Sequence, residues 1–581
     1  MRPRIGKRVY LPATLVLALV SFAASRRPPI DVAPRPVAPQ VPPSSSSEIL
    51  TAADVQSIVS NAGREAARQG IAAVIAVVDR EENILSVFRM DGAPRDLQLV
   101  GRRDGFATSD GAHGLPGVIV AGPGVPDATI LAAVSKAGTA AVFETTGNAF
   151  STRTASFIIQ EHFPPGIDFT PGGPLFGVQF SNLPCTDVKR VDPAGGNLAL
   201  PLGLSGDPGG LPLYKNGQPV GAIGVEGNGI YAVDFDPAVR DPAAEELAAL
   251  AGTRGFEAPR EIRGDQIFVN GIRLPFADAE VPEPGGAVPA GSFVPGFAPR
   301  DGQPSVFVPV VVAGLPATAD PRFYPFSGSS APEGLTADEV SRIIGQALAQ
   351  AYQTRAAIRR PLGSAAQVNA AVVDARGVVL GIARTPDAPV FGFDVSAQKA
   401  RTAAFFSSAA AGAALSAAGF DEYVGNAARD GLHLNGAVAF SDRATGFLSR
   451  PFFPDGINES AAGPFSRPIA EWSPFNDGLQ VDLLRETLLG IVAGARAIAP
   501  PCTRIPAIAH GVQIFPGSVP LYKNGVLVGG IGVSGDGVDQ DDVIATMGSA
   551  GFEAPEEIRS DRVLVRNVRL PWVKFPRHPN L

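Results

Sequence analysis

Two lysine–threonine pairs are the residues best placed to act on a ligand. Lys136 with Thr139, and Lys399 with Thr402, are three residues apart in stretches that predict helices. At that spacing the two side chains of a pair share one face of a helix. Each pair could therefore offer a cation and a hydroxyl group to a bound molecule. The alternative is structural, with the lysine at the edge of the helix and the threonine packed on a sheet.

Two arginines occupy a second repeated stretch. Arg153 and Arg443 each lie among aromatic residues, in segments that match without a gap. The fork of an arginine there could clamp a carboxylate, or it could brace a loop through backbone carbonyls. His162 lies beside a Phe-Pro-x-Gly-Ile sequence, but Phe452 occupies the equivalent place in the other copy. Met90 ends an apolar strand, where a methionine is typical of a core rather than a metal ligand.

Cys185 and Cys502 are the two cysteines of the chain, one in each repeated half. They allow one internal disulfide, but a sequence does not show whether their Cα atoms come within bonding range. A bridge and two free thiols both stay open. The chain has no Walker sequence, no His-Glu-x-x-His and no Ser/His/Asp constellation, so we predict no metal site and name no catalytic residue.

The candidate residues belong to a unit that occurs twice. Residues 50–55 recur at 335–340, and in both copies a threonine is followed three residues later by an acid, Asp54 or Glu339. This pattern predicts a helix that begins with a capping box. Apolar residues then follow in the same helical phase in both copies, so the two helices should bury equivalent faces.

Strand pairs follow each of these helices. Apolar runs flank an Asn-Gly dipeptide at 216–217 and again at 524–525, which is the strongest short hairpin signal. The predicted order of elements in each unit is therefore helix, hairpin, helix, long insertion, hairpin, short helix and terminal strand. Hairpins cannot build a parallel sheet, so we predict an α+β fold of two similar domains, each an antiparallel sheet flanked by helices.

The composition excludes some classes of protein. The chain has 581 residues, which is too long for one hydrophobic core, so it should contain at least two domains. Its hydrophobic content of 45% is normal for folded domains. With a net charge of −8 and no basic patch, nucleic-acid binding is not expected. We expect a signal peptide at 1–25, a Pro/Ser-rich linker at 26–49, one domain at 50–275, a Pro/Gly-rich linker at 276–334 and a second domain at 335–575.

The N-terminal segment predicts export. Arg2, Arg4, Lys7 and Arg8 precede an apolar stretch, with small residues suited to cleavage near residues 23–25. An uncleaved anchor is the alternative, but no later segment is long and apolar enough to span a membrane. We therefore expect a periplasmic or secreted protein without a stable membrane span after cleavage.

The repeated unit resembles the GlcG/HbpS family of haem-binding proteins. The residues that carry the resemblance in the first copy are 77–79, 89–93, 135–141 and 210–225. The second copy keeps the equivalent residues at 372–374, 399–404 and 528–535, but its version of Arg-Met-Asp-Gly-Ala has become Arg-Thr-Pro-Asp-Ala. The blocks cover somewhat under half of each domain, because each copy carries an insertion of over a hundred residues.

The resemblance implies a profilin-like or PAS-like two-layer fold, oligomer formation, and haem or a related tetrapyrrole as ligand. A Lys-Thr pair could then serve a haem propionate or the iron. However, none of the five histidines lies on the first helix of either unit, where some relatives supply a ligand. We expect an exported haem-binding protein in which fusion replaces a homodimer interface by an internal pseudo-dimer, with further homo-oligomers open.

Two other functions stay open. One is an enzyme that degrades haem or acts on a small organic ligand in the same pocket. The other is a non-catalytic structural or sensory partner protein, in which the insertions make the contacts.

Overall fold

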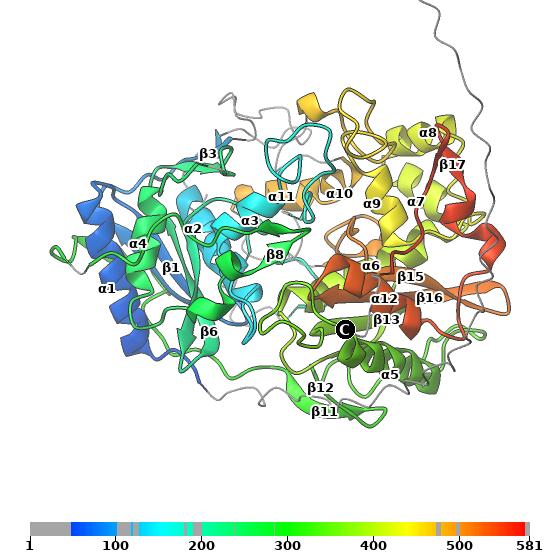
Figure 1. The fold of residues 1–581 in the computed structure, drawn as a ribbon, viewed down its shortest axis with the longest axis horizontal. Helices are drawn as coiled ribbons and strands as arrows, with labels where there is room; N and C mark the ends of the chain where they lie inside the picture. The colour runs from blue at the N-terminus through cyan, green and yellow to red at the C-terminus, as the bar shows by residue number, and fades with distance from the viewer. Residues whose placement is uncertain are drawn as a thin grey trace, which may run out of the picture. The chain divides into compact units, whose positions relative to one another are not determined.

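An antiparallel five-stranded sheet forms the centre of the first half (Figure 1). In the computed structural model its strand order is β10-β2-β1-β6-β5. The strands are β1 (Val74–Asp79), β2 (Ile84–Met90), β5 (Gly210–Lys215), β6 (Gln218–Glu226) and β10 (Gly291–Phe293). The structure describes residues 48–575 apart from 101–117, 120–126, 179–182, 190–199, 238, 284, 472–477 and 495–499. The expected signal peptide and most of the first linker thus lie outside the described residues.

The second half repeats this sheet with one strand added. Its order is β11-β12-β14-β13-β16-β15, and every pairing is antiparallel. The strands are β11 (Val308–Val312), β12 (Leu315–Ala319), β13 (Val368–Asp374), β14 (Val379–Arg384), β15 (Ser518–Lys523) and β16 (Val526–Gly535). The α+β fold predicted from the hairpins is therefore confirmed.

The stretch between the halves supplies edge strands to both sheets. We expected a Pro/Gly-rich linker over 276–334. Instead β10 pairs with β2 of the first sheet, and the β11–β12 hairpin closes the second sheet next to β14. The apolar valines of β11 could be identified from their sequence, whereas the short β10 has no such pattern.

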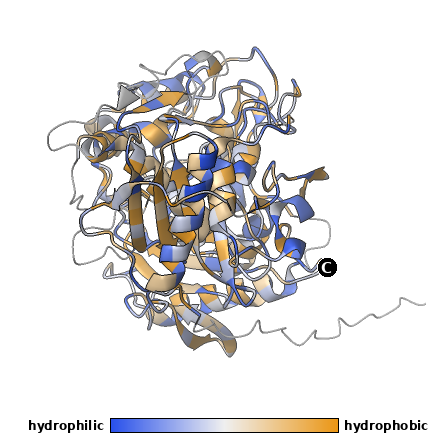
Figure 2. Cartoon of the chain, turned by 90° about the vertical axis from the view of Figure 1, so that its left-hand side faces the viewer, coloured by the Kyte–Doolittle hydropathy of each residue, from blue (hydrophilic) through white to orange (hydrophobic). Residues whose placement is uncertain are grey.

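Helices cover both faces of the first sheet. The elements are α1 (Ala52–Arg68) and α4 (Ala244–Gly252) on one face and α2 (Ala128–Val142) on the other. Alternate residues of β1 enter two separate cores: Ile75 and Val77 pack toward α1 and α4, while Val74 and Ala76 pack toward α2. The unit thus has three layers rather than the two we expected, because β1 is buried on both faces. Apolar residues accordingly concentrate in the central strands (Figure 2).

Corresponding helices of the second half begin in the same way. They are α5 (Ala337–Gln353), α6 (Phe391–Phe406) and α12 (Val538–Gly548). Thr51 caps α1 and Thr336 caps α5, and each threonine exchanges hydrogen bonds with the acid three residues on. The capping boxes predicted from the sequence are therefore present in both halves.

Glycines in β6 and β16 allow a helix to lie directly on the sheet. A Cβ atom on Gly224 would lie 2.1 Å from the carbonyl oxygen of Ala133 in α2. On Gly532 it would lie 2.1 Å from the carbonyl oxygen of Ser396 in α6. These glycines thus serve the close packing of helix against strand.

The remaining elements belong mostly to the insertions and to the end of each unit. In the first half they are β3 (Leu97–Val100), β4 (Val118–Ile119), α3 (Thr152–Ile158), β7 (Ile230–Ala232), β8 (Phe268–Val269) and β9 (Ile272–Arg273). In the second half they are α7 (Ala411–Ala417), α8 (Asp421–Arg429), α9 (Asp442–Leu448), α10 (Leu479–Asp482), α11 (Arg485–Val492), β17 (Leu564–Val565) and β18 (Val568–Arg569). Six short 3-10 turns complete the described elements: 260–262, 264–266, 469–471, 506–508, 556–558 and 560–562. None of the helices in the described part has the length and apolar character needed to cross a bilayer.

Candidate functional site

Lys136 lies at the centre of α2 and is fully buried. Its Nζ is 2.9 Å from a carboxylate oxygen of Asp207 and 2.9 Å from one of Glu226, and it donates to the carbonyl of Val225. Burial alone would lower the pKa of Lys136, but the two carboxylates outweigh it and hold this pKa above its usual value. Thr139 donates to the carbonyl of Ser135. Protein groups therefore occupy this pair, and its role as a ligand contact stays a prediction.

The second pair has the same geometry with fewer acids. The Nζ of Lys399 donates to Asp541 at 3.0 Å and to the carbonyl of Val533 at 2.8 Å. Thr402 donates to Gln398 and accepts from the backbone of Gln513. One carboxylate thus pairs with Lys399, where Lys136 has two.

Arg153 holds a buried cluster of acids. Its guanidinium contacts Asp234 at 2.7 Å, Glu246 at 2.6 Å and Asp278 at 2.9 Å, with Asp241 at 4.0 Å. The arginine thus contacts carboxylates, and it also donates to the backbone carbonyl of Asp241 at 3.4 Å. One positive charge faces four carboxylates, so the cluster has a surplus of negative charge.

The cluster around Arg443 contains two cations and two acids. Arg443 forms ion pairs with Asp539 and Asp542, and Lys574 adds a second cation 2.7 Å from Asp539. Lys574 occupies the position of Asp278 in the ungapped alignment of the two copies. A lysine in the second half therefore replaces an acid of the first.

His162 lies where the two insertions meet. Its Nδ1 is 2.8 Å from the carbonyl oxygen of Thr170, and its ring lies parallel to that of Phe452 at 6.0 Å. His162 and Phe452 are equivalent residues of the repeat. Asn458 likewise donates to its own equivalent, Asp168, at 3.1 Å.

Cys185 and Cys502 form a disulfide that joins the insertions of the two halves. Their Cα atoms are 5.3 Å apart, although the residues are separated by 317 positions in sequence. Both sulfurs lie in a buried apolar cluster with residues of β3, α2 and α11.

A buried polar network connects the halves near this disulfide. Arg401 forms an ion pair with Asp187 of the first insertion at 2.6 Å, and both contact His510. The other ring nitrogen of His510 lies 3.3 Å from Asp394. One indication is visible in the sequence, since Arg401 occupies the position of Gly138 in the first copy.

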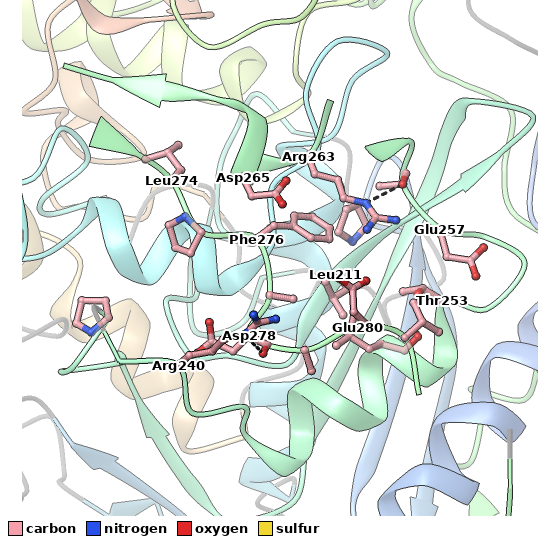
Figure 3. A pocket seen from close by; sticks show the side chains of 18 of the residues that line it. Leu211, Arg240, Thr253, Glu257, Arg263, Asp265, Leu274, Phe276, Asp278 and Glu280 are labelled. Carbon is pink, nitrogen blue, oxygen red and sulfur yellow. Dashed lines mark hydrogen bonds between the residues drawn. The ribbon is translucent and has the colours of Figure 1, made fainter. Parts of the chain in front are cut away.

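An open cavity of about 340 Å³ lies in the first half, between β5, α4 and the segment after β9 (Figure 3). Its walls combine apolar groups such as Leu211, Leu250 and Phe276 with the three arginines Arg240, Arg263 and Arg273. The lining also includes acids, among them Asp278 of the Arg153 cluster. Of the predicted site residues that the structure describes, none lines this cavity directly.

Arg263 is the best-defined cation of the cavity. Its guanidinium lies over the ring of Phe276, with its central carbon 5.3 Å from the ring centroid, and Nε donates to the carbonyl of Ala258 at 2.9 Å (Figure 3). These two contacts fix the plane of the guanidinium. Within the described residues, its terminal nitrogens have neither a hydrogen-bond nor an ion-pair partner.

Comparison with known proteins accounts for the repeated unit. The family model described as "Haem degrading protein HbpS-like" matches residues 50–103 and residues 492–550. The first stretch holds α1, β1 and β2 of the first half, and the second holds β15, β16 and α12 of the second half. Both halves of the chain thus contain sequence that is similar to the HbpS-like family.

Solved structures similar to this chain cover little more than a third of it. They include the Klebsiella pneumoniae protein ORFY (20% identity, 37% of this chain and 96% of that one, TM-score 0.21). A double mutant of HbpS from Streptomyces reticuli has 21% identity, covers 38% and 95%, and has a TM-score of 0.20. A structure titled "PduOC:Heme Complex" has 18% identity, covers 38% and 97%, and has a TM-score of 0.19. No curated protein sequence matches the chain.

We did not predict this cavity from the sequence, although a repeated sequence pattern lies next to it. Arg263 and Asp265 follow the repeated Gly-Phe-Glu-Ala-Pro block, and Arg559 and Asp561 follow its second copy. An Arg-x-Asp pattern that is present in both copies indicates an equivalent charged position in each half. What the sequence did not show is that the two arginines have different partners.

Proposed function

We propose that this protein binds haem or a related tetrapyrrole and does so outside the cytoplasm. The observation that carries the proposal is the HbpS-like match in both halves, in a family described by its action on haem. Haem binding requires an apolar surface and cations for the two propionates. The cavity beside Arg263 provides both, since its lining includes Phe276 and Leu250 as well as three arginines.

The lining residues fit the organic part of haem better than its iron. In the described part of the chain, the cavity wall includes no histidine, cysteine, methionine, tyrosine or lysine. Arg263 would bind a propionate and Phe276 would contact the ring. The bound haem would supply redox-active iron, while the protein groups would orient the ring and exclude water from one face.

The test is a titration of haem into the purified full chain, followed at the Soret band. We expect a saturable shift of the band. A spectrum that equals the sum of free haem and free protein at every ratio would remove the proposal. Serum albumin at equal mass should be run in parallel, because it shows what a non-specific apolar surface contributes.

Haem degradation is the second candidate, favoured by the description of the family. If the protein breaks down the ring, incubation with haem and peroxide or a reductant should yield open-chain products at a catalytic rate. Loss of the Soret band at the rate seen with haem alone would leave binding as the activity.

Export is supported by two features of the chain. The N-terminal residues have the charge and apolar pattern of a signal peptide, and the disulfide between Cys185 and Cys502 suits an oxidising compartment. N-terminal sequencing of protein recovered from the periplasm or medium should find a start close to residue 26. Recovery of the intact chain in the membrane fraction would favour the anchor instead.

We further propose that the halves are related by an internal pseudo-two-fold axis. At such an axis equivalent residues meet, as His162 meets Phe452 and Asp168 meets Asn458. The expected particle in light scattering is a monomer of 59.9 kDa before any signal cleavage. A smaller oligomer than single-domain relatives form is also compatible, whereas an octamer of full-length chains would contradict this replacement of a dimer interface.

A further inference from the structure

We infer that the cavity beside Arg263 is a carboxylate-binding site, built for an acid group attached to a flat apolar body, and that the second half lacks its equivalent. The inference does not depend on haem, since any molecule of this chemistry would satisfy it. Haem propionates and small free aromatic acids are the two sources that the experiment must separate.

The first step is the state of Arg263 itself. A guanidinium fixed by a ring contact and by one bond from Nε presents its terminal nitrogens as a preformed fork. Phe276, against which it lies, is only 7% exposed and therefore does not move freely. A planar acid could pair with the fork and extend over the apolar groups of the wall.

The second step concerns the acids of the lining, which have other partners. Asp278 contacts Arg153 at 2.9 Å and accepts from the backbone of Asp241 at 3.1 Å. Asp265 faces Arg273 at 3.8 Å. The lining is therefore mixed in charge, but in the described structure no acid lies within ion-pair distance of Arg263.

Glu257 and Glu280 complete the acids of the wall. The side chain of Glu257 accepts from the backbone of Gly255 at 2.9 Å, and Glu280 is exposed to solvent. Neither carboxylate contacts Arg263, so the described residues supply it with no counter-ion.

The third step is the equivalent arginine of the second half. Arg559 lies over Trp572 as Arg263 lies over Phe276, at 5.7 Å. However, both its Nε and a terminal nitrogen contact Asp561, at 3.3 and 3.4 Å. The second half thus supplies its own carboxylate to the same arginine, which occupies the place that a ligand would take.

The test uses 2-naphthoate as probe on the full-length protein, by isothermal titration. Wild type should bind it saturably, and Arg263→Gln should weaken binding by about tenfold or more, since a charge-assisted hydrogen bond is lost. Arg559→Gln is the matched control and should leave the affinity within about twofold, which lies inside ordinary measurement scatter. Neutral 2-naphthamide should bind weakly and equally to all three proteins.

Several results would overturn the inference: no saturable binding of 2-naphthoate, equal losses in the two variants, or an amide that binds as well as the acid. If Arg263→Gln proves unfolded by circular dichroism, Arg263→Lys replaces it and should show a smaller loss than tenfold but a larger one than Arg559→Gln. Equal affinities of the lysine variant and wild type would count against the fork.

Haem titrated into the same variants separates this inference from the proposed function. Binding of haem without binding of 2-naphthoate leaves the proposed function standing and refutes the carboxylate site. Binding of 2-naphthoate without haem does the reverse. If Arg263→Gln weakens both, a haem propionate uses the site; if it weakens 2-naphthoate alone, the natural occupant is a free acid.

Discussion

Arg263 in the first half and Arg559 in the second occupy equivalent positions of one repeat, yet their charges are balanced differently. Asp561 neutralises Arg559, whereas the equivalent Asp265 faces Arg273 instead. The difference extends beyond this pair of positions. The buried lysines differ as well, since Lys136 pairs with Asp207 and Glu226 whereas Lys399 pairs with Asp541 alone.

This contrast indicates how the two copies of a duplicated domain can come to have different roles. An arginine that is already paired with a carboxylate, as Arg559 is with Asp561, gains little from an anionic ligand. Arg263 gains more, because in the described structure its terminal nitrogens have no acidic partner. The proposed carboxylate site therefore lies in the first half.

The largest effect should come from the buried lysines. Lys136→Met would leave Asp207 and Glu226 buried without their cation, at a cost of about 3–5 kcal/mol in the free energy of unfolding. Lys399→Met would leave only Asp541, so its cost should be smaller. Urea unfolding of both variants measures this, and an equal or reversed order would break the comparison.

The disulfide tests whether the halves depend on one another. Cys185→Ser with Cys502→Ser opens a link between residues 317 positions apart, which should cost about 2–5 kcal/mol. Thermal unfolding of the double variant should then begin at a lower temperature. Wild type treated with a reductant should behave like the variant, and an unchanged curve in both would show that the bridge does not stabilise the fold.

The Lys399 cluster also predicts a dependence on pH. Burial raises the pKa of Asp541 from 3.8 to about 6, so the folded state holds this proton more tightly than the unfolded state. The stabilisation is complete below about pH 4 and is lost as the pH rises through about 6, a change of roughly 3 kcal/mol at most. Wild type should therefore lose stability relative to Asp541→Asn between about pH 4 and pH 7. A constant difference in the temperature of unfolding would refute the shifted pKa.

The helix caps test whether equivalent positions of the two halves contribute equally to stability. Thr51→Ala and Thr336→Ala each remove a capping box and should each cost about 1 kcal/mol. Equal losses of stability in the two variants are expected, because the local geometry is the same. A loss in one variant alone would show that one cap is supported by contacts from elsewhere.

The sequence predicted local features well because local residues determine them. The capping boxes and the Asn-Gly hairpins depend on neighbours within a few positions, and both halves have them. The partners of Lys136 could not be predicted, because Asp207 and Glu226 lie some seventy and ninety residues further along the chain (207 − 136 and 226 − 136). Distant residues, one of them at the end of β6, thus supply the acids that pair with Lys136.

Edge strands and layers were harder to predict. Residues 291–293 form an edge strand only because β2 offers an open side, and nothing in their own sequence indicates it. The third layer was missed because continuous apolar runs in β1 can also occur in a sheet with one covered face. Sequence therefore predicted the fold class and the repeat, but neither the balance of charge nor the cavity beside Arg263.

The most direct test of the account is the amount of haem that the full chain retains through gel filtration, measured by pyridine haemochrome. A single haem per chain is predicted, retained by Arg559→Gln and reduced in Arg263→Gln. Two haems per chain, or equal retention by the two variants, would contradict the assignment of binding to the first half. No haem retained above an albumin-corrected background would contradict haem binding itself.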